Sequence, residues 1–281
     1  MLAVLGGLGA AFAWAATTIA ASRAMRLIDV PSLLASVMVV GLLVAAPAAA
    51  IAGVPSALDA HSLAWMAVSG VGNVVGLLFT YSALRIGKVG LVAPITSTEG
   101  AVAAVIAVVA GESLSPGSGV TLAAIAVGVA LAAVSPGEEA VRHSDRRAIL
   151  LAAGAALAFG FGLYATGRVG QDLGVAWAVL PPRVVGVAVI ALPLALARRW
   201  QMRRAAVPFV VVAGLCEVLG FASFSFGARH GLAVSAVLAS QFAAIAAVVG
   251  YLALGERLGR VQVAGIVTII VGVSVLSILH G

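Results

Sequence analysis

The feature that most constrains this chain is a series of ten apolar runs, each about as long as one helical crossing of a bilayer. Such a crossing needs about 20 mostly apolar residues. The runs cover approximately 2–22, 31–52, 63–84, 89–110, 118–135, 148–168, 175–197, 207–228, 232–254 and 261–279. Because lipid offers no hydrogen-bond partners to the backbone, runs of this kind form α-helices. The sequence therefore predicts an all-α integral membrane protein with ten transmembrane helices.

The composition excludes two other classes of protein. Hydrophobic types make up 63% of the chain and charged residues only 9%, against roughly 25% charged residues in a soluble domain. A soluble enzyme and a disordered chain are both excluded, since the first needs a polar surface and the second needs low hydrophobicity. The formal charge of +6 comes from basic residues in the short gaps between runs. The expected partner is therefore the lipid bilayer rather than nucleic acid.

The basic residues also predict an orientation. Most of them fall in the loops after the first, third, fifth, seventh and ninth runs, whereas the opposite loops hold only Arg168 and Arg229. Short loops rich in Lys and Arg remain in the cytoplasm. We therefore expect a multi-pass protein of the cell (plasma) membrane, with both termini outside. The first run lacks a basic start, so we interpret it as a retained helix rather than a signal peptide.

The chain also contains an internal repeat. A shift of 144 residues places Gly76 on Gly220 and Arg85 on Arg229, and it places the Gly-Glu-x-Leu string at 111–114 on that at 255–258. The first helices match less well, with Phe12 on Phe159 at a shift of 147.

This duplication predicts the domain organisation. The predicted units are a first five-helix repeat at 1–135, a connecting loop at 136–147 and a second repeat at 148–281. Because five is odd, the second copy enters from the opposite side, which gives two inverted repeats with a binding site between them.

Four features of the sequence resemble the EamA-type transporters of the drug/metabolite transporter superfamily. They are the five-plus-five duplication, the strings 82–85 and 226–229 after the third and eighth runs, the repeated Gly-Glu-x-Leu turn, and the glycine pair in the last run, Gly265 and Gly272. The resemblance implies transport. Members of the family export or exchange small metabolites such as amino acids, and some import them, so the resemblance fixes neither direction nor substrate. The family pattern also has an arginine early in the second and seventh helices. Arg183 fits the seventh, and the matching position in the second is near Ser36.

Three charged residues fall inside apolar runs, where a charge costs roughly 2.5–3.5 kcal/mol on insertion scales. They are Glu99, Arg183 and Glu217. The repeat places Glu217 on Asn73, so both halves put a polar group at one depth. Glu217 is interpreted as a ligand for a substrate amine or a proton-coupling carboxylate, with a structural ion pair to Arg183 as the alternative. Arg183 is a candidate clamp for a substrate carboxylate, although it can equally hold helices together.

Glu99 follows a cluster of hydroxyls and Pro94, a pattern typical of a broken helix beside a binding site. It is the second candidate for coupling. Polar groups recur at the same depth in the ninth run, and aromatic side chains are available for the cavity wall, although packing explains them equally well. The further candidate binding residues are Thr96, Ser97, Ser240, Gln241, Trp14 and Tyr81.

Other classes of function have weaker support in the sequence. The four histidines lie in loops or at the chain end, and there is no nucleophile, zinc or phosphate-binding motif. No cofactor, metal or catalysis is therefore expected. We predict a secondary transporter of a small polar or amphipathic metabolite, acting by alternating access and exporting it, with a proton as the candidate coupling ion. A proton-coupled multidrug exporter is the alternative, and a non-catalytic membrane scaffold is less favoured.

Overall fold

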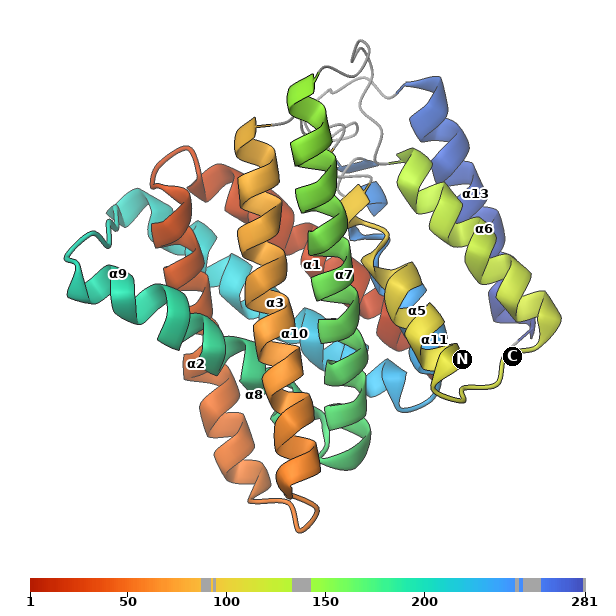
Figure 1. The fold of residues 1–281 in the computed structure, drawn as a ribbon, viewed down its shortest axis with the longest axis horizontal. Coiled ribbons are helices and arrows are strands. Elements are labelled where there is room, and N and C mark those ends of the chain that lie inside the picture. Colours follow the sequence, from red (N-terminus) through yellow and green to blue (C-terminus); the bar gives the residue numbers. More distant parts are fainter. Residues whose placement is uncertain (87–91, 93–94, 133–142, 246–247, 250–258, 280–281) are drawn as a thin grey trace.

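The protein folds into a bundle of helices (Figure 1). The structure is a computed structural model that describes residues 1–86, 92, 95–132, 143–245, 248–249 and 259–279, and within these ranges it contains no strand. The helices are α1 (Leu2–Ala24), α2 (Val30–Ala52), α3 (Ala60–Ile86), α5 (Glu99–Val109), α6 (Pro116–Ala132), α7 (His143–Asp172), α8 (Val175–Gly186), α9 (Leu192–Leu196), α10 (Val207–Ala228), α11 (Leu232–Ala239) and α13 (Arg260–Leu279). A π-helical turn, Val187–Ala191, joins α8 to α9, and a 3₁₀ turn, Arg204–Ala206, precedes α10.

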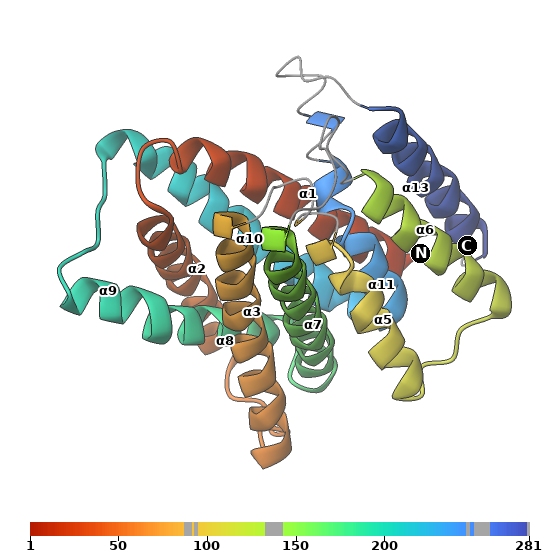
Figure 2. The same ribbon diagram turned by 45° about the horizontal axis from the view of Figure 1, so that its top comes forward.

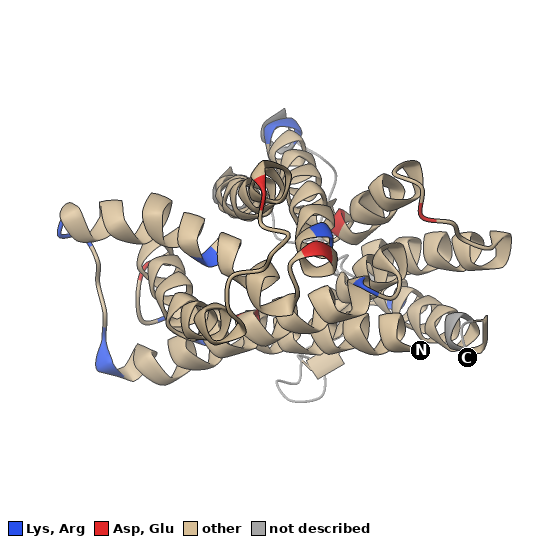
Figure 3. Cartoon of the chain, turned by 90° about the horizontal axis from the view of Figure 1, so that it is seen from below, with Lys and Arg blue, Asp and Glu red and all other residues tan. Residues whose placement is uncertain are grey.

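Six of the described helical segments are long and apolar enough to cross a membrane. They are Leu2–Ala24, Val30–Ala52, Ala60–Ala83, Arg146–Asp172, Val175–Leu196 and Arg204–Ala228. Charged residues fall mainly at helix ends and connections (Figure 3). The protein is thus a multi-pass integral membrane protein. Four further apolar helices are shorter, and parts of the expected runs 89–110, 118–135 and 232–254 lie outside the described residues, so ten crossings remain a prediction.

The helix packing has an approximate twofold pattern, in which the main contacts between helices are matched by contacts between their counterparts in the other half of the chain. Helix α3 packs along α7, and its counterpart α10 packs along α1. Helices α2 and α8, α5 and α11, and α6 and α13 each pack against their own counterpart. Figures 1 and 2 both show α6 beside α13 at one end of the bundle, near the two chain termini. Segments far apart in the sequence therefore build each layer together.

Two glycines from the repeat each leave room for an aromatic ring of the helix that packs alongside. A Cβ atom on Gly76 of α3 would meet the ring of Phe159, and one on Gly220 of α10 would meet the ring of Trp14. The matching of Phe12 with Phe159 in the sequence is therefore wrong, because Phe12 is 61% exposed and Trp14 occupies the equivalent place. The apolar sequence of α1 offered no signal to separate the two aromatic residues.

The fourth and ninth runs are both interrupted at the same depth. Helix α5 begins at Glu99 after a turn at 97–98, whereas α11 ends at Ala239 before a turn at 240–241, and the helix then resumes. The two helices meet closely, since a Cβ atom on Gly100 would lie 2.7 Å from the Ser240 hydroxyl. Pro94, which motivated the expectation of a broken helix, lies outside the described residues.

Helix α8 continues through its two prolines. Pro181 and Pro182 lie inside the helix, and the π-helical turn at Val187–Ala191 follows within one helical turn. A proline removes a backbone donor, and π-helical turns accommodate such disturbances, often at functional sites. Arg183 is therefore presented from the middle of a distorted helix, not from its first residue.

The start of α11 is capped by a side chain from the other half of the chain. Both carboxylate oxygens of Glu112, in the turn after α5, accept a hydrogen bond from the backbone N–H of Ala233, at 3.1 and 3.2 Å. The first N–H groups of a helix have no partner within the helix, so a carboxylate there is stabilising. Burial nevertheless raises the pKa of Glu112, although the N–H groups of Ala233 and Leu232 act in the opposite direction.

We expect Glu112→Ala to lower the stability of the folded protein. Loss of a helix cap costs about 1 kcal/mol, and here the cap also joins the two halves. Thermal unfolding in detergent measures the effect, with Ser113→Ala at the exposed neighbouring position as the control. An unfolding temperature equal to that of the control would contradict the capping role.

Candidate functional site

A cavity of about 340 Å³ lies in the interior of the bundle. Its walls come from α1, α3, α5, α7 and α10, with Met25, Thr96 and Phe242 from the segments just after α1, before α5 and after α11. The lining residues are Trp14, Thr17, Thr18, Ala21, Met25, Ser69, Asn73, Leu77, Thr80, Tyr81, Thr96, Glu99, Phe159, Gly162, Leu163, Glu217, Phe221 and Phe242. Both halves of the chain therefore contribute to one site.

The structure brings six of the ten predicted binding residues to this cavity. They are Trp14, Asn73, Tyr81, Thr96, Glu99 and Glu217. Arg183, Ser97, Ser240 and Gln241 are buried but do not line it. The hydroxyl of Ser240 donates to the carbonyl of Val237 inside its own helix, and the Gln241 amide nitrogen has no hydrogen-bond partner among the described residues.

Glu217 lines the cavity and also pairs with Arg183 behind it. One guanidinium nitrogen lies 3.6 Å from the Glu217 carboxylate, and a second donates to the Glu217 backbone carbonyl at 3.4 Å. The guanidinium carbon lies 4.8 Å from the centre of the Phe221 ring, and Gly41 of α2 leaves room for the Arg183 stem. Glu217 therefore forms the structural ion pair with Arg183 and also faces the cavity, and its role in binding or coupling stays a prediction.

Glu99 differs from Glu217 in that none of the described residues forms an ion pair with it. It is the first residue of α5, and it is 8% exposed. A carboxylate at the first turn of a helix is favoured by the helix dipole. The first half of the chain thus supplies one acidic group to the cavity and the second half supplies the other.

Several lining residues were missed in the sequence, although their spacing contains a signal. Ser69, Asn73, Leu77 and Thr80 recur every three or four residues along α3, which places them on one face of the helix. The α1 residues Trp14, Thr17, Thr18, Ala21 and Met25 recur in the same way. If the polar residues of each helix had been compared for helical spacing as a group, the cavity-facing sides of α1 and α3 would have been identified.

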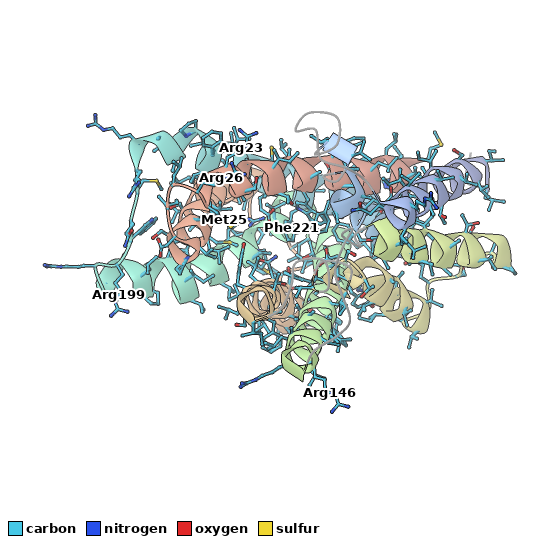
Figure 4. The ribbon with its side chains drawn as sticks, turned by 90° about the horizontal axis from the view of Figure 1, so that it is seen from above. Arg23, Met25, Arg26, Arg146, Arg199 and Phe221 are labelled. Atoms are coloured by element: carbon cyan, nitrogen blue, oxygen red, sulfur yellow. The ribbon has the colours of Figure 1, made fainter. Side chains whose placement is uncertain are left out.

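The cavity extends towards one end of the bundle. It reaches Met25, which lies with Arg23 and Arg26 at the C-terminal end of α1, whereas Phe221 points inwards and Arg146 and Arg199 point away (Figure 4). At the opposite end the helices are in close contact, since Ser235 donates to the carbonyl of Ala3 at 2.9 Å.

A second cavity of about 520 Å³ lies near that opposite end. It is lined by Ala107, Ala110, Gly111, Glu112, Ser113, Tyr164, Arg168, Gln171, Ala228, Arg229, His230, Gly231 and Leu232. Leu163 lines the first cavity and the next residue, Tyr164, lines the second. Packed side chains therefore separate two cavities that lie at successive depths in the bundle.

These features define a multi-pass membrane protein with an internal cavity whose walls are mostly apolar and carry two carboxylates. The chain belongs to the EamA-like transporter family, whose sequence model matches residues 1–134 and 146–278. The family resemblance is thereby confirmed, and membership makes the protein a membrane transporter of the drug/metabolite transporter type.

The fold is also found among solved structures. One crystal structure of a protein superposes with a TM-score of 0.81 at 19% sequence identity, covering 99% of this chain and 96% of the other. At this identity the likeness shows the fold alone. No curated protein matches the sequence.

The ion pair predicts an asymmetry between two substitutions. Glu217→Gln leaves the charge of Arg183, which is 0% exposed, without a counter-charge, and arginine does not lose its proton. Arg183→Met leaves Glu217 beside a cavity, where water or a proton can compensate it. Breaking a buried pair from one side costs about 3–5 kcal/mol, so we expect the larger loss of thermal stability from Glu217→Gln.

The double variant Glu217→Gln/Arg183→Met tests the same point, because it removes both charges and should recover most of the lost stability. Thermal unfolding of the four proteins in one detergent gives the double-mutant cycle. Additive effects of the two single changes would contradict the pairing.

Proposed function

We propose that the protein is a secondary transporter that exports a small polar or amphipathic metabolite by alternating access. The observation that supports this most is the cavity of about 340 Å³ inside the bundle, with two acidic side chains, one from each half of the chain. Its volume falls in the range of small-molecule sites. A purely structural bundle would have no use for two carboxylates at such a place, because burying them is costly.

The mechanism we propose is an exchange of conformation between two inverted repeats. The division into 1–135, 136–147 and 148–281 is supported by the two segments that match the family and by the exchange symmetry of the helix contacts. The two cavities are separated by packed side chains around Leu163 and the Ser235–Ala3 hydrogen bond. In the proposed mechanism, a rearrangement of this packing connects the binding cavity to the second cavity. At the same time the end of the binding cavity near Met25 closes.

Export is the direction that we propose. The basic loops predict that the C-terminal end of α1 lies in the cytoplasm and both termini lie outside. The cavity extends towards that end, next to Arg23 and Arg26, so a substrate would enter from the cytoplasm. Glu99 and Glu217 are the candidates for coupling export to a proton, with the gradient of the substrate itself as the other driving force.

The lining favours one alternative substrate class. Five aromatic side chains, Trp14, Tyr81, Phe159, Phe221 and Phe242, face the cavity, although the whole chain has only 6% aromatic residues. A cavity of this composition also suits lipophilic drugs, so a proton-coupled multidrug exporter remains the second candidate function. The identity of the exported compound decides between the two.

The export claim predicts a difference between cells that express the wild type and cells that express Glu99→Gln at the same membrane level. Gln has the same size but no charge, so any substrate that needs this carboxylate should accumulate less outside. Mass spectrometry of the medium measures the accumulation. Asp172→Asn, the same chemical change at an exposed residue that lines neither cavity, is the matched control.

A compound that accumulates with the wild type and the control, but not with Glu99→Gln, is the expected result. Equal accumulation with all three proteins would contradict the role of Glu99. No accumulation with any of them, relative to cells without the protein, would contradict export.

A further inference from the structure

The charge that the cavity presents to a ligand is acidic. Glu99 and Glu217 are the charged members of its lining. Together with Arg183, which lies behind the wall, they give the region a net formal charge of −1. Charge interactions are strong in a site from which water is largely excluded. From this geometry we propose that the binding cavity selects organic cations, in particular protonated amines attached to one aromatic or apolar group.

Arg183 is not placed to bind a substrate anion. It is fully buried, and its two terminal nitrogens contact the Glu217 carboxylate and backbone carbonyl and the Met38 sulfur, at 3.6, 3.4 and 3.6 Å. Its Nε is buried without a hydrogen-bond partner among the described residues, and Arg183 does not line the cavity. One face of the guanidinium also covers the ring of Phe221. A substrate carboxylate would have to displace Glu217 to reach it. The cation in this region therefore fixes Glu217 and leaves the rest of the cavity acidic.

The aromatic lining supports the same ligand class. Trp14 stands at the centre of a cluster, with its ring centroid 5.3 Å from that of Phe221 and 6.4 Å from that of Phe242. The faces of aromatic rings attract cations, and the ring of an arylalkyl group packs against other rings edge to face. The cavity thus offers carboxylates for a cationic group and rings for an apolar group.

Hydrogen-bond acceptors complete the site. Asn73 Oδ1 and Thr80 Oγ1 are buried without a hydrogen-bond partner in the described part of the chain, and both residues belong to the cavity wall. An ammonium group has three donors and no acceptor. Both oxygens can accept from a protonated amine. An added carboxylate would meet no cation among the described lining residues, only neutral donors such as the indole N–H of Trp14, which has no partner in the described part of the chain.

This inference rests on the proposed function and narrows it from small metabolites to cationic ones. The cavity is expected to bind an amine more tightly than the amino acid that has the same ring and amine but also a carboxylate. The cavity volume of about 340 Å³ lies near the lower end of small-molecule sites. A ligand with one ring suits this volume better than a large polycyclic cation does.

The test compares 2-phenylethylamine with L-phenylalanine, which has the same ring and amine but an added carboxylate. Binding to the purified protein in lipid nanodiscs is measured by calorimetry at neutral pH. We expect the amine to bind at least about tenfold more tightly, which corresponds to about one good charge interaction. Glu99→Gln should weaken amine binding by about the same factor, and Asp172→Asn should leave it unchanged.

Each other outcome decides against either the inference or the proposed function. Equal or tighter binding of phenylalanine would overturn the inference and leave a transport role intact. An equal loss of both ligands in Glu99→Gln would also overturn it, because it would show a structural effect only. Binding of neither probe would overturn it as well. Amine binding without amine movement in proteoliposomes would support the inference and contradict the proposed function.

Discussion

The contact on which the rest of the site depends is the one between Arg183 and Glu217. A guanidinium with no exposed surface, inside a helix of a membrane protein, is tolerated only where carboxylate, carbonyl and aromatic partners surround it. Those partners lie on α10, and Gly41 on α2 provides the space. The ion pair therefore fixes three helices relative to one another and holds the Glu217 carboxylate at the cavity wall.

The two halves of the chain share a packing pattern but differ in their polar groups. The second half has Arg183 and Glu217, where the first has Ser36 or its neighbour and Asn73. The first half instead supplies Glu99. Duplicated backbones therefore enclose a cavity whose charges are not duplicated.

Much of the helix pattern could be predicted from the sequence, because each crossing must be apolar for its whole length. The central place of Glu217, Asn73 and Glu99 could also be predicted, since polar groups in lipid are costly and tend to face an interior cavity. The direction of the other side chains could not. A transmembrane helix such as α1 is apolar on its lipid face and on its packed face, so hydrophobicity does not show which face is which. Thr17, Phe221 and Phe242 were missed for this reason.

Contacts between helices that are far apart in the sequence were the second feature that could not be predicted. Ser240 and Gln241 occupy the depth predicted by the repeat, but the close contact of α5 with α11 leaves them behind the cavity wall. Gly100 permits that contact, and the identity of a single glycine does not reveal its neighbour. The sequence also did not show that Glu217 lines the cavity while Arg183 supports it from behind. This difference depends on which of their two helices lies nearer to the cavity.

The central claim is that one cavity opens alternately to the two sides of the membrane. The most direct measurement is labelling of single cysteines by a membrane-impermeant maleimide applied to either side, in a Cys216→Ser protein with cysteine at Ala21 or at Ser113. Ala21 lines the binding cavity and Ser113 lines the second cavity. The account predicts that a bound substrate changes the labelling of the two positions in opposite directions, with Ala21 reached from the cytoplasm. Labelling of both positions that does not respond to any substrate would contradict it.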